Sequence, residues 1–180
     1  SANANLTARD TTAPDAPAAL VINAGGTTVT GSGENGARVT VLAPDGSTVG
    51  TGTVANGTFT VTLNPAQADG QALKVTLTDT AGNVSAATQL TAPDITAPAV
   101  PTLAISANGG TLTGTGAPGA TFKIVNAAGT ELASGTVAAN GTFSATLATA
   151  LINKEVLSVT LADAAGNVSG AASVTAPDLT

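Results

Sequence analysis

Short runs of alternating apolar and polar residues recur along the chain. In the clearest run, Phe59, Val61 and Leu63 would lie on one side of an extended strand, with threonines on the other. The runs 38–42 and 73–78 alternate in the same way and are rich in β-branched residues. No segment keeps an apolar stripe with a 3.6-residue period over three turns, so the pattern predicts strands rather than helices.

Turn-forming residues, mainly Gly, Asn-Gly and Pro-Asp-Gly, interrupt these runs every 8–12 residues. Alternation is weakest in segment 148–154, the one place that could form a helical turn. In the first half of the chain the pattern predicts seven strands, at 18–23, 27–31, 37–43, 47–54, 58–63, 72–78 and 84–91. Seven short strands in a stretch of this length fit an immunoglobulin-like β-sandwich.

Three motifs occur twice, and each second copy follows the first by 84 residues. Between Gly31 and Gly46 the offset to the second copy falls to 83, which indicates a one-residue indel that is later reversed. The motifs are Asp-x-Thr-Ala-Pro, which begins at 10 and 94, Asn-Gly-Thr-Phe, which begins at 56 and 140, and Asp-x-Ala-Gly-Asn-Val-Ser, which begins at 79 and 163.

The repeat sets the expected domain boundaries. We predict an all-β chain of two tandem seven-stranded sandwiches, 10–93 and 94–177, arranged end to end without a disulfide. Residues 1–9 are expected to be the tail of a preceding repeat or a cloning scar, and 178–180 the start of another. The chain is therefore interpreted as a two-repeat excerpt from a longer array.

Composition excludes several kinds of site. The 180 residues carry a net charge of −6 and include three Phe but no Cys, His, Trp, Tyr or Met. A zinc site, a haem ligand and a His-based triad are therefore excluded, and we expect no enzymatic activity. The acidic balance argues against nucleic acid, and no apolar run approaches the roughly 18 residues that span a bilayer. The remaining oxygen ligands are those that calcium prefers.

Taken together, the three repeated motifs resemble those of bacterial Ig-like repeats. Such repeats occur in giant biofilm-associated and type I-secreted, RTX-type adhesins. The resemblance covers essentially the whole chain, twice. It implies an extracellular stalk on the bacterial cell surface, with calcium at the junctions between repeats.

The acidic residues are placed where junctions would lie. Because strand direction alternates in an antiparallel sandwich, the sixth loop returns to the end at which the repeat begins. We therefore expect loop 79–83 beside the entry segment 10–17, and loop 163–167 beside 94–101. Like charges gathered at one place repel unless a cation neutralises them, and calcium accepts 6–8 oxygens in loose geometry.

This reasoning predicts calcium ligands at each junction. The middle junction would collect Asp94, Asp163 and Asn167 together with Asp45 or Asp69, and the junction after the second repeat would be poorer. The alternative is that Asp79 and its counterpart start ordinary turns and that the entry aspartates are solvated. The candidate ligands are Asp94, Asp163, Asn167, Asp10, Asp15, Asp79, Asn83, Asp45, Asp69 and Asp178.

Other signals are interpreted structurally. The sequons that begin at Asn56 and Asn140 are expected to be type I′ hairpin turns rather than glycosylation sites, because Asn-Gly separates two alternating runs. All three phenylalanines are assigned to the cores. Asp10 and Asp15 could pair for glycosidic acid–base chemistry, but no aromatic subsite supports that function.

The favoured function is that of a spacer. The repeats would stack as a stalk that projects an adhesive tip in adhesion and biofilm formation, with neighbouring repeats of the same chain as partners and the fragment itself monomeric. Alternatively, the repeats themselves bind a surface ligand or one another, or they form an accessory module of a secreted hydrolase. Binding by isolated repeats would favour adhesion, and a neighbouring catalytic domain would favour the hydrolase.

Overall fold

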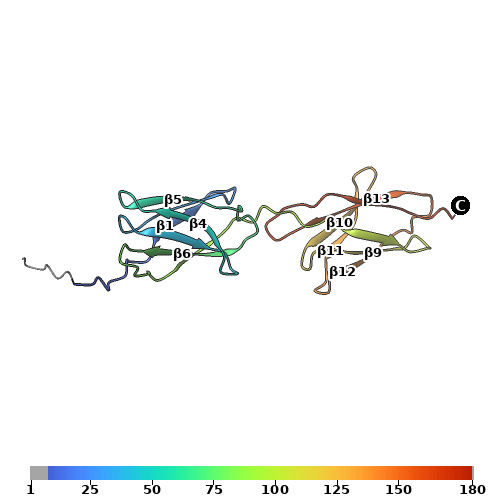
Figure 1. The fold of residues 1–180 in the computed structure, drawn as a ribbon. Helices are drawn as coiled ribbons and strands as arrows, with labels where there is room; N and C mark the ends of the chain where they lie inside the picture. Colours follow the sequence, from blue (N-terminus) through green and yellow to red (C-terminus); the bar gives the residue numbers. More distant parts are fainter. Residues whose placement is uncertain (1–7, 180) are drawn as a thin grey trace, which may run out of the picture. The chain divides into compact units, whose positions relative to one another are not determined.

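The chain folds into two compact units, Ser1–Ile95 and Thr96–Thr180, in a computed structural model that describes residues 8–179. Within that range every regular element is a β-strand (Figure 1). None of the described residues therefore lies in a helix that could cross a membrane. The predicted all-β class of two tandem sandwiches is confirmed.

Unit 1 is a sandwich of a three-stranded and a four-stranded antiparallel sheet, in the orders β1-β2-β5 and β4-β3-β6-β7. Its strands are β1 (Ala18–Ile22), β2 (Thr28–Ser32), β3 (Arg38–Leu42), β4 (Thr48–Thr53), β5 (Thr58–Thr62), β6 (Ala72–Thr78) and β7 (Thr88–Thr91). Six predicted strands are confirmed to within one or two residues. The seventh begins at residue 88 rather than 84, because Ser85 turns inward and only Val84 forms an isolated bridge.

Unit 2 has the same topology, with sheets in the orders β12-β9-β8 and β11-β10-β13-β14. Its strands are β8 (Thr102–Ile105), β9 (Thr111–Thr115), β10 (Thr121–Asn126), β11 (Glu131–Thr136), β12 (Thr142–Thr146), β13 (Val156–Ala162) and β14 (Ala172–Thr175). The two sequence repeats are therefore two copies of one fold.

The helical turn considered for residues 148–154 does not form. Backbone N–H groups just before and within this stretch bond to another loop: Leu147 donates to the Gly110 carbonyl at 2.9 Å and Leu151 to the Gly109 carbonyl at 3.0 Å. Lys154 adopts φ 58°, which also ends any right-handed helical path. The segment is held as a loop against the β8–β9 turn.

The indel inferred from the repeat offset has a structural form. In β1 the register against β2 shifts between Ala18 and Val21, and the extra residue, Ala19, has φ 50°. The corresponding pairing of β8 with β9 is regular. Unit 1 thus carries a β-bulge, which inserts one residue without changing the rest of the sheet.

The compensating residue lies in the hairpin before the fifth strand of unit 2. In unit 1, Asn56 and Gly57 have φ 52° and 77°, which confirms the predicted type I′ turn. In unit 2 that prediction is wrong. In this hairpin Gly141 alone has positive φ. The Ala138 carbonyl accepts the Gly141 N–H, and the Ala138 N–H donates to the Thr142 carbonyl, so the loop is one residue longer than in unit 1.

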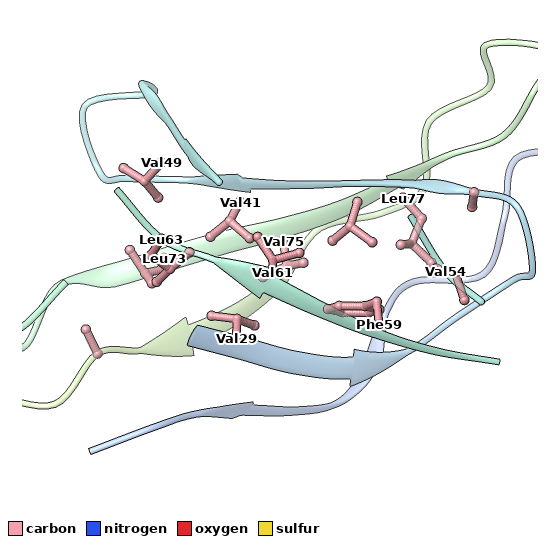
Figure 2. Close-up of a cluster of buried hydrophobic side chains, with 13 residues drawn as sticks. Val29, Val41, Val49, Val54, Phe59, Val61, Leu63, Leu73, Val75 and Leu77 are labelled. Atoms are coloured by element: carbon pink, nitrogen blue, oxygen red, sulfur yellow. The ribbon is translucent and has the colours of Figure 1, made fainter. Parts of the chain in front are cut away.

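Each unit buries its own core between its two sheets. Figure 2 shows the core of unit 1, in which Val29, Phe59 and Leu77 lie among valines and leucines from both layers. Phe59 and Phe143 are 4% and 5% exposed, which confirms their assignment to the cores. Each phenylalanine ring lies across from a glycine on the paired strand, where an added Cβ would clash with the ring.

The second core is packed differently around Phe122, which occupies the position of Val39 and is also buried. Its ring stacks on Phe143 with centroids 4.6 Å apart and an interplanar angle of 22°. The larger Phe122 is matched by a smaller residue, Ala145, at the position of Val61. This exchange keeps the core filled, as close packing requires.

Candidate functional site

The β6–β7 turn of unit 1 is organised by the Asp79 carboxylate. Its Oδ1 accepts hydrogen bonds from the backbone N–H groups of Ala81 and Asn83 at 2.8 and 2.9 Å, and its Oδ2 accepts one from Asn83 Nδ2 at 2.7 Å. The Asn83 side chain, followed by these backbone bonds, keeps the pKa of Asp79 below its usual range. The geometry is that of an aspartate that starts a turn.

Asn83 also connects this turn to the start of the repeat. Its Nδ2 donates to the carbonyl oxygens of Asp10 and Thr12 at 3.3 and 3.2 Å. Thr88 Oγ1 adds a hydrogen bond to the Pro17 carbonyl at 2.7 Å. The prediction that loop 79–83 lies beside the entry segment 10–17 is therefore confirmed, and the contact uses main-chain carbonyls.

The equivalent turn of unit 2 has the same internal structure. Asp163 Oδ1 accepts the Asn167 N–H at 2.9 Å, and Oδ2 accepts Asn167 Nδ2 at 2.9 Å. As in unit 1, the hydrogen bond from the asparagine side chain, here Asn167, is the main reason that the pKa of the Asp163 carboxyl is lowered. Gly82 and Gly166 complete the two turns with φ 93° and 91°. Both asparagine amides are thus oriented by an aspartate.

At the other end of unit 1, its last residues are hydrogen-bonded to the loop between β5 and β6. Asp94 forms an isolated antiparallel bridge with Asp69. The flanking backbone bonds run from the Gly70 N–H to the Pro93 carbonyl at 3.2 Å, and from the Ile95 N–H to the Ala68 carbonyl at 2.9 Å. The structure thus brings together two of the predicted site residues, Asp69 and Asp94, through their main chains.

Unit 2 repeats this arrangement at its own exit. Asp178 bridges Asn153, and Leu179 donates its N–H to the Ile152 carbonyl at 2.8 Å. Lys154 occupies the position of Gly70, and its Nζ lies 2.5 Å from Asp178 Oδ2. A cation of the protein itself therefore pairs with the aspartate in this second copy.

The remaining candidates serve local turns or face solvent. Asp45 Oδ1 accepts the Ser47 N–H and hydroxyl at 2.9 and 2.7 Å, and the hydroxyl is the larger cause of its lowered pKa. Asp10 Oδ1 accepts the Thr12 N–H at 3.0 Å, and Asp15 is exposed. Among residues 8–179 no three acidic side chains gather into a group that could hold a metal ion.

Sequence reasoning missed a buried serine that follows each asparagine by two positions. Ser85 Oγ accepts the Leu77 N–H at 2.9 Å and donates to the Ala86 carbonyl at 2.8 Å. Ser169 does the same for Leu161 in unit 2. The repetition of Asn-Val-Ser was a signal for this role, although the sequence alone did not separate it from a glycosylation motif.

A shallow groove lies along the three-stranded sheet of unit 2. Residues of β8, β9, β11 and β12 line it, and hydroxyl side chains such as Thr102, Thr113 and Ser144 alternate there with apolar residues such as Leu103 and Phe143. Thr102 and Thr115 share a hydrogen bond between their hydroxyls at 2.5 Å. The groove offers hydrogen-bonding groups but no titratable side chain.

Comparisons with solved structures find matches at low identity and with TM-scores below 0.5. The chain is similar to a BSP domain of a biofilm-associated protein (22% identity, TM-score 0.43), covering 94% of itself but only 29% of that chain. It is also similar to a two-domain fibronectin type III segment of chicken tenascin (16% identity, TM-score 0.41), covering 89% of this chain and 98% of that one. The fibronectin(III)-like modules of Clostridium thermocellum CbhA match at 17% identity and TM-score 0.35, with 93% and 90% covered.

No curated protein matches the chain. The comparison with protein families is decisive, because two consecutive stretches, 13–94 and 97–178, each match the bacterial Ig domain. The two matched stretches correspond to the two sandwiches described above. The chain belongs to the bacterial Ig domain family, of which it contains two tandem copies.

Proposed function

We propose that this chain is a spacer: two consecutive units of a stalk that holds a binding region away from a bacterial cell surface. The observation that carries the proposal is the duplication itself, in which the same Ig fold is built twice with a short connection. That connection is not free chain, because Pro93 and Ile95 are hydrogen-bonded to loop 68–70 of unit 1 and Asp94 bridges Asp69. Repeat proteins grow along one direction as units are added, which suits a spacer.

The proposal includes a role in adhesion and biofilm formation and an extracellular location. It is supported by the match of both repeats to the bacterial Ig domain family, and the absence of cysteine is compatible with export. An incubation of the purified fragment with bacterial cells, glycans and its own labelled copy tests the spacer role. A spacer binds none of them, whereas saturable binding would replace the proposal with direct adhesion.

Calcium at the junctions is a separate part of the proposal. It is supported by the pairing of Asp69 with Asp94 in unit 1 and by the oxygen-only chemistry of the chain. Because no three acidic groups gather in residues 8–179, carbonyl, amide or water oxygens would have to supply most of the ligands. Calorimetric titration with calcium after EDTA treatment tests it, and saturable heat that is lost in an Asp94→Ala variant is the expected result.

The groove on β8, β9 and β12 favours a second candidate function, direct binding of a hydroxyl-rich ligand such as a glycan. Its threonines supply donors and acceptors, as sugar recognition requires. Against it, the Phe143 ring is 5% exposed and offers little stacking surface. A glycan array screened with the wild-type chain and a Thr113→Val variant distinguishes this function from the spacer.

A further inference from the structure

Asparagine followed by glycine occurs at four places in the chain, with the asparagine at positions 35, 56, 108 and 140. In this dipeptide the glycine nitrogen can attack the asparagine side chain, because glycine has no Cβ to hinder the approach. All four asparagines are exposed, so solvent reaches each of them. What differs is how the fold holds the two reacting groups, which are the side-chain amide and the next main-chain nitrogen.

Asn35, Asn108 and Asn140 are held at both groups. Their Oδ1 atoms each accept a nearby backbone N–H, at 2.5, 3.1 and 3.1 Å in chain order. The glycine nitrogens that follow them each donate to a main-chain carbonyl, at 2.9, 2.9 and 2.8 Å. The attack on any of these three amides therefore requires hydrogen bonds of both reacting groups to open first.

Asn56 is held differently. Its side chain has no hydrogen-bond partner within residues 8–179. The N–H of the following Gly57 donates to the exposed side chain of Asn35, at 2.5 Å, rather than to a main-chain carbonyl. The Asn56 amide can therefore turn toward the Gly57 nitrogen without breaking a bond of its own.

The second hairpin provides a comparison within the same chain. The segment Ala-Asn-Gly-Thr-Phe occurs at 55–59 and again at 139–143. In the second copy Asn140 Oδ1 accepts both the N–H and the hydroxyl of Thr142, at 3.1 and 2.8 Å. Gly141 donates its N–H to the Ala138 carbonyl at 2.8 Å. The same five residues are thus folded in two ways, with the asparagine amide free in one hairpin and bonded in the other.

We propose that Asn56 is a self-modification site, at which water deamidates unit 1 without an enzyme. The Gly57 nitrogen, once it has lost its proton to hydroxide, forms a bond to Asn56 Cγ. The Cγ–Nδ2 bond then breaks, and the amide nitrogen takes a proton from water and leaves as ammonia. Water opens the resulting succinimide ring to aspartate or isoaspartate.

The modification changes the hairpin in two ways. Both products add a negative charge at position 56, and isoaspartate also adds one atom to the main chain of a two-residue turn whose length sets the strand register. Because the reaction needs only water, the modified fraction rises with the age of the chain. The proposal is independent of the spacer role, since it concerns one turn of unit 1.

Peptide mass spectrometry of the folded chain, incubated in mildly alkaline buffer, measures the rate at each asparagine. The five basic residues place each of the four Asn-Gly pairs in its own tryptic peptide, and an isoaspartyl methyltransferase identifies isoaspartate. One hydrogen bond of ordinary net strength changes an opening equilibrium about fivefold. Asn56 should therefore react faster than Asn140 by that factor or more.

Two controls connect this difference to the fold. In urea the identical segments 55–59 and 139–143 should react at equal rates. Asn35→Ala, which removes the acceptor of the Gly57 N–H, should raise the rate at Asn56 and leave the rate at Asn140 unchanged, and circular dichroism establishes that this variant is folded. The comparison in the parent chain does not depend on that variant. Equal rates at Asn56 and Asn140 in the folded parent, or a difference that persists in urea, would overturn the proposal.

Discussion

The buried serine after the β6–β7 turn makes a sharp prediction about stability. In Ser85→Ala the hydroxyl that accepts the Leu77 N–H at 2.9 Å is removed, while the bond from the Ser85 N–H to the Leu77 carbonyl stays. Leu77 is fully buried and Ser85 is 7% exposed, so water has little access to the freed N–H. The substitution therefore leaves a buried donor without an acceptor.

The expected cost follows from that vacancy. An unsatisfied buried donor destabilises a fold by about 1–3 kcal/mol. For a domain of this size that corresponds to a fall in Tm of roughly 4–8 °C for each kcal/mol. Because each unit has its own core, only the transition of unit 1 should move, and Ser169→Ala should move only that of unit 2.

Calorimetry of the 180-residue chain measures both transitions in one scan. Ser173→Ala is the matched control, since that serine is exposed on β14 of the same kind of sheet and should change Tm by little. A fall in the unit 1 Tm of less than about 2 °C in Ser85→Ala, well under the range that the unsatisfied donor implies, would refute the reasoning. It would mean that water or a shifted main chain satisfies Leu77.

Three further predictions concern the core, a turn and pH. Val39→Phe and Val61→Ala should each destabilise unit 1 by about 1–3 kcal/mol. The double variant should cost less than the sum of the two, because unit 2 fills its core with the same pair of a larger and a smaller residue, and urea unfolding in a double-mutant cycle measures this coupling. Gly26→Ala should unfold or strongly destabilise unit 1, since a Cβ there would lie 1.9 Å from the Gln67 carbonyl oxygen. Gly36→Ala is the control: its φ is also positive but the space around it is open, so it should cost only backbone strain of about 1 kcal/mol. Thermal melts followed by circular dichroism measure both effects. Because folding lowers the pKa of Asp79, its contribution to stability is present above its unfolded pKa, about 3.9, and is lost as pH falls through the lower folded value. The free energy of unfolding, measured from pH 7 to 2, should therefore decline below about pH 4, and Asp79→Asn should flatten that decline.

The fold was predictable because hydrophobic alternation and turn residues agree along the whole chain. Phe59, Val61 and Leu63 mark their strand and its buried face, and the repeat fixes the number of domains. The errors have local causes. Residues 84–87 look like strand, but the serine at 85 bonds back to Leu77, and the two Asn-Gly hairpins differ by one inserted residue.

The candidate site was only partly predictable. Reasoning from strand direction placed Asp79 and Asn83 beside the entry segment, as the structure confirms. What it could not supply was the kind of contact, because main-chain carbonyls and the orientation of an amide leave no trace in the sequence. The sequence also did not reveal that Lys154 would take the left-handed position held by Gly70 and pair with the next aspartate.

Reach at a cell surface tests the spacer role most directly. A membrane-anchored peptide tag is displayed on cells behind zero, one or two copies of this chain, and the height of the tag is measured by fluorescence interference or by the capture of rigid probes. The spacer account predicts that height rises in equal steps with each copy, while the chain adds no binding of its own. A height that does not increase with copy number, or cells that adhere through the chain without a tag, would contradict it.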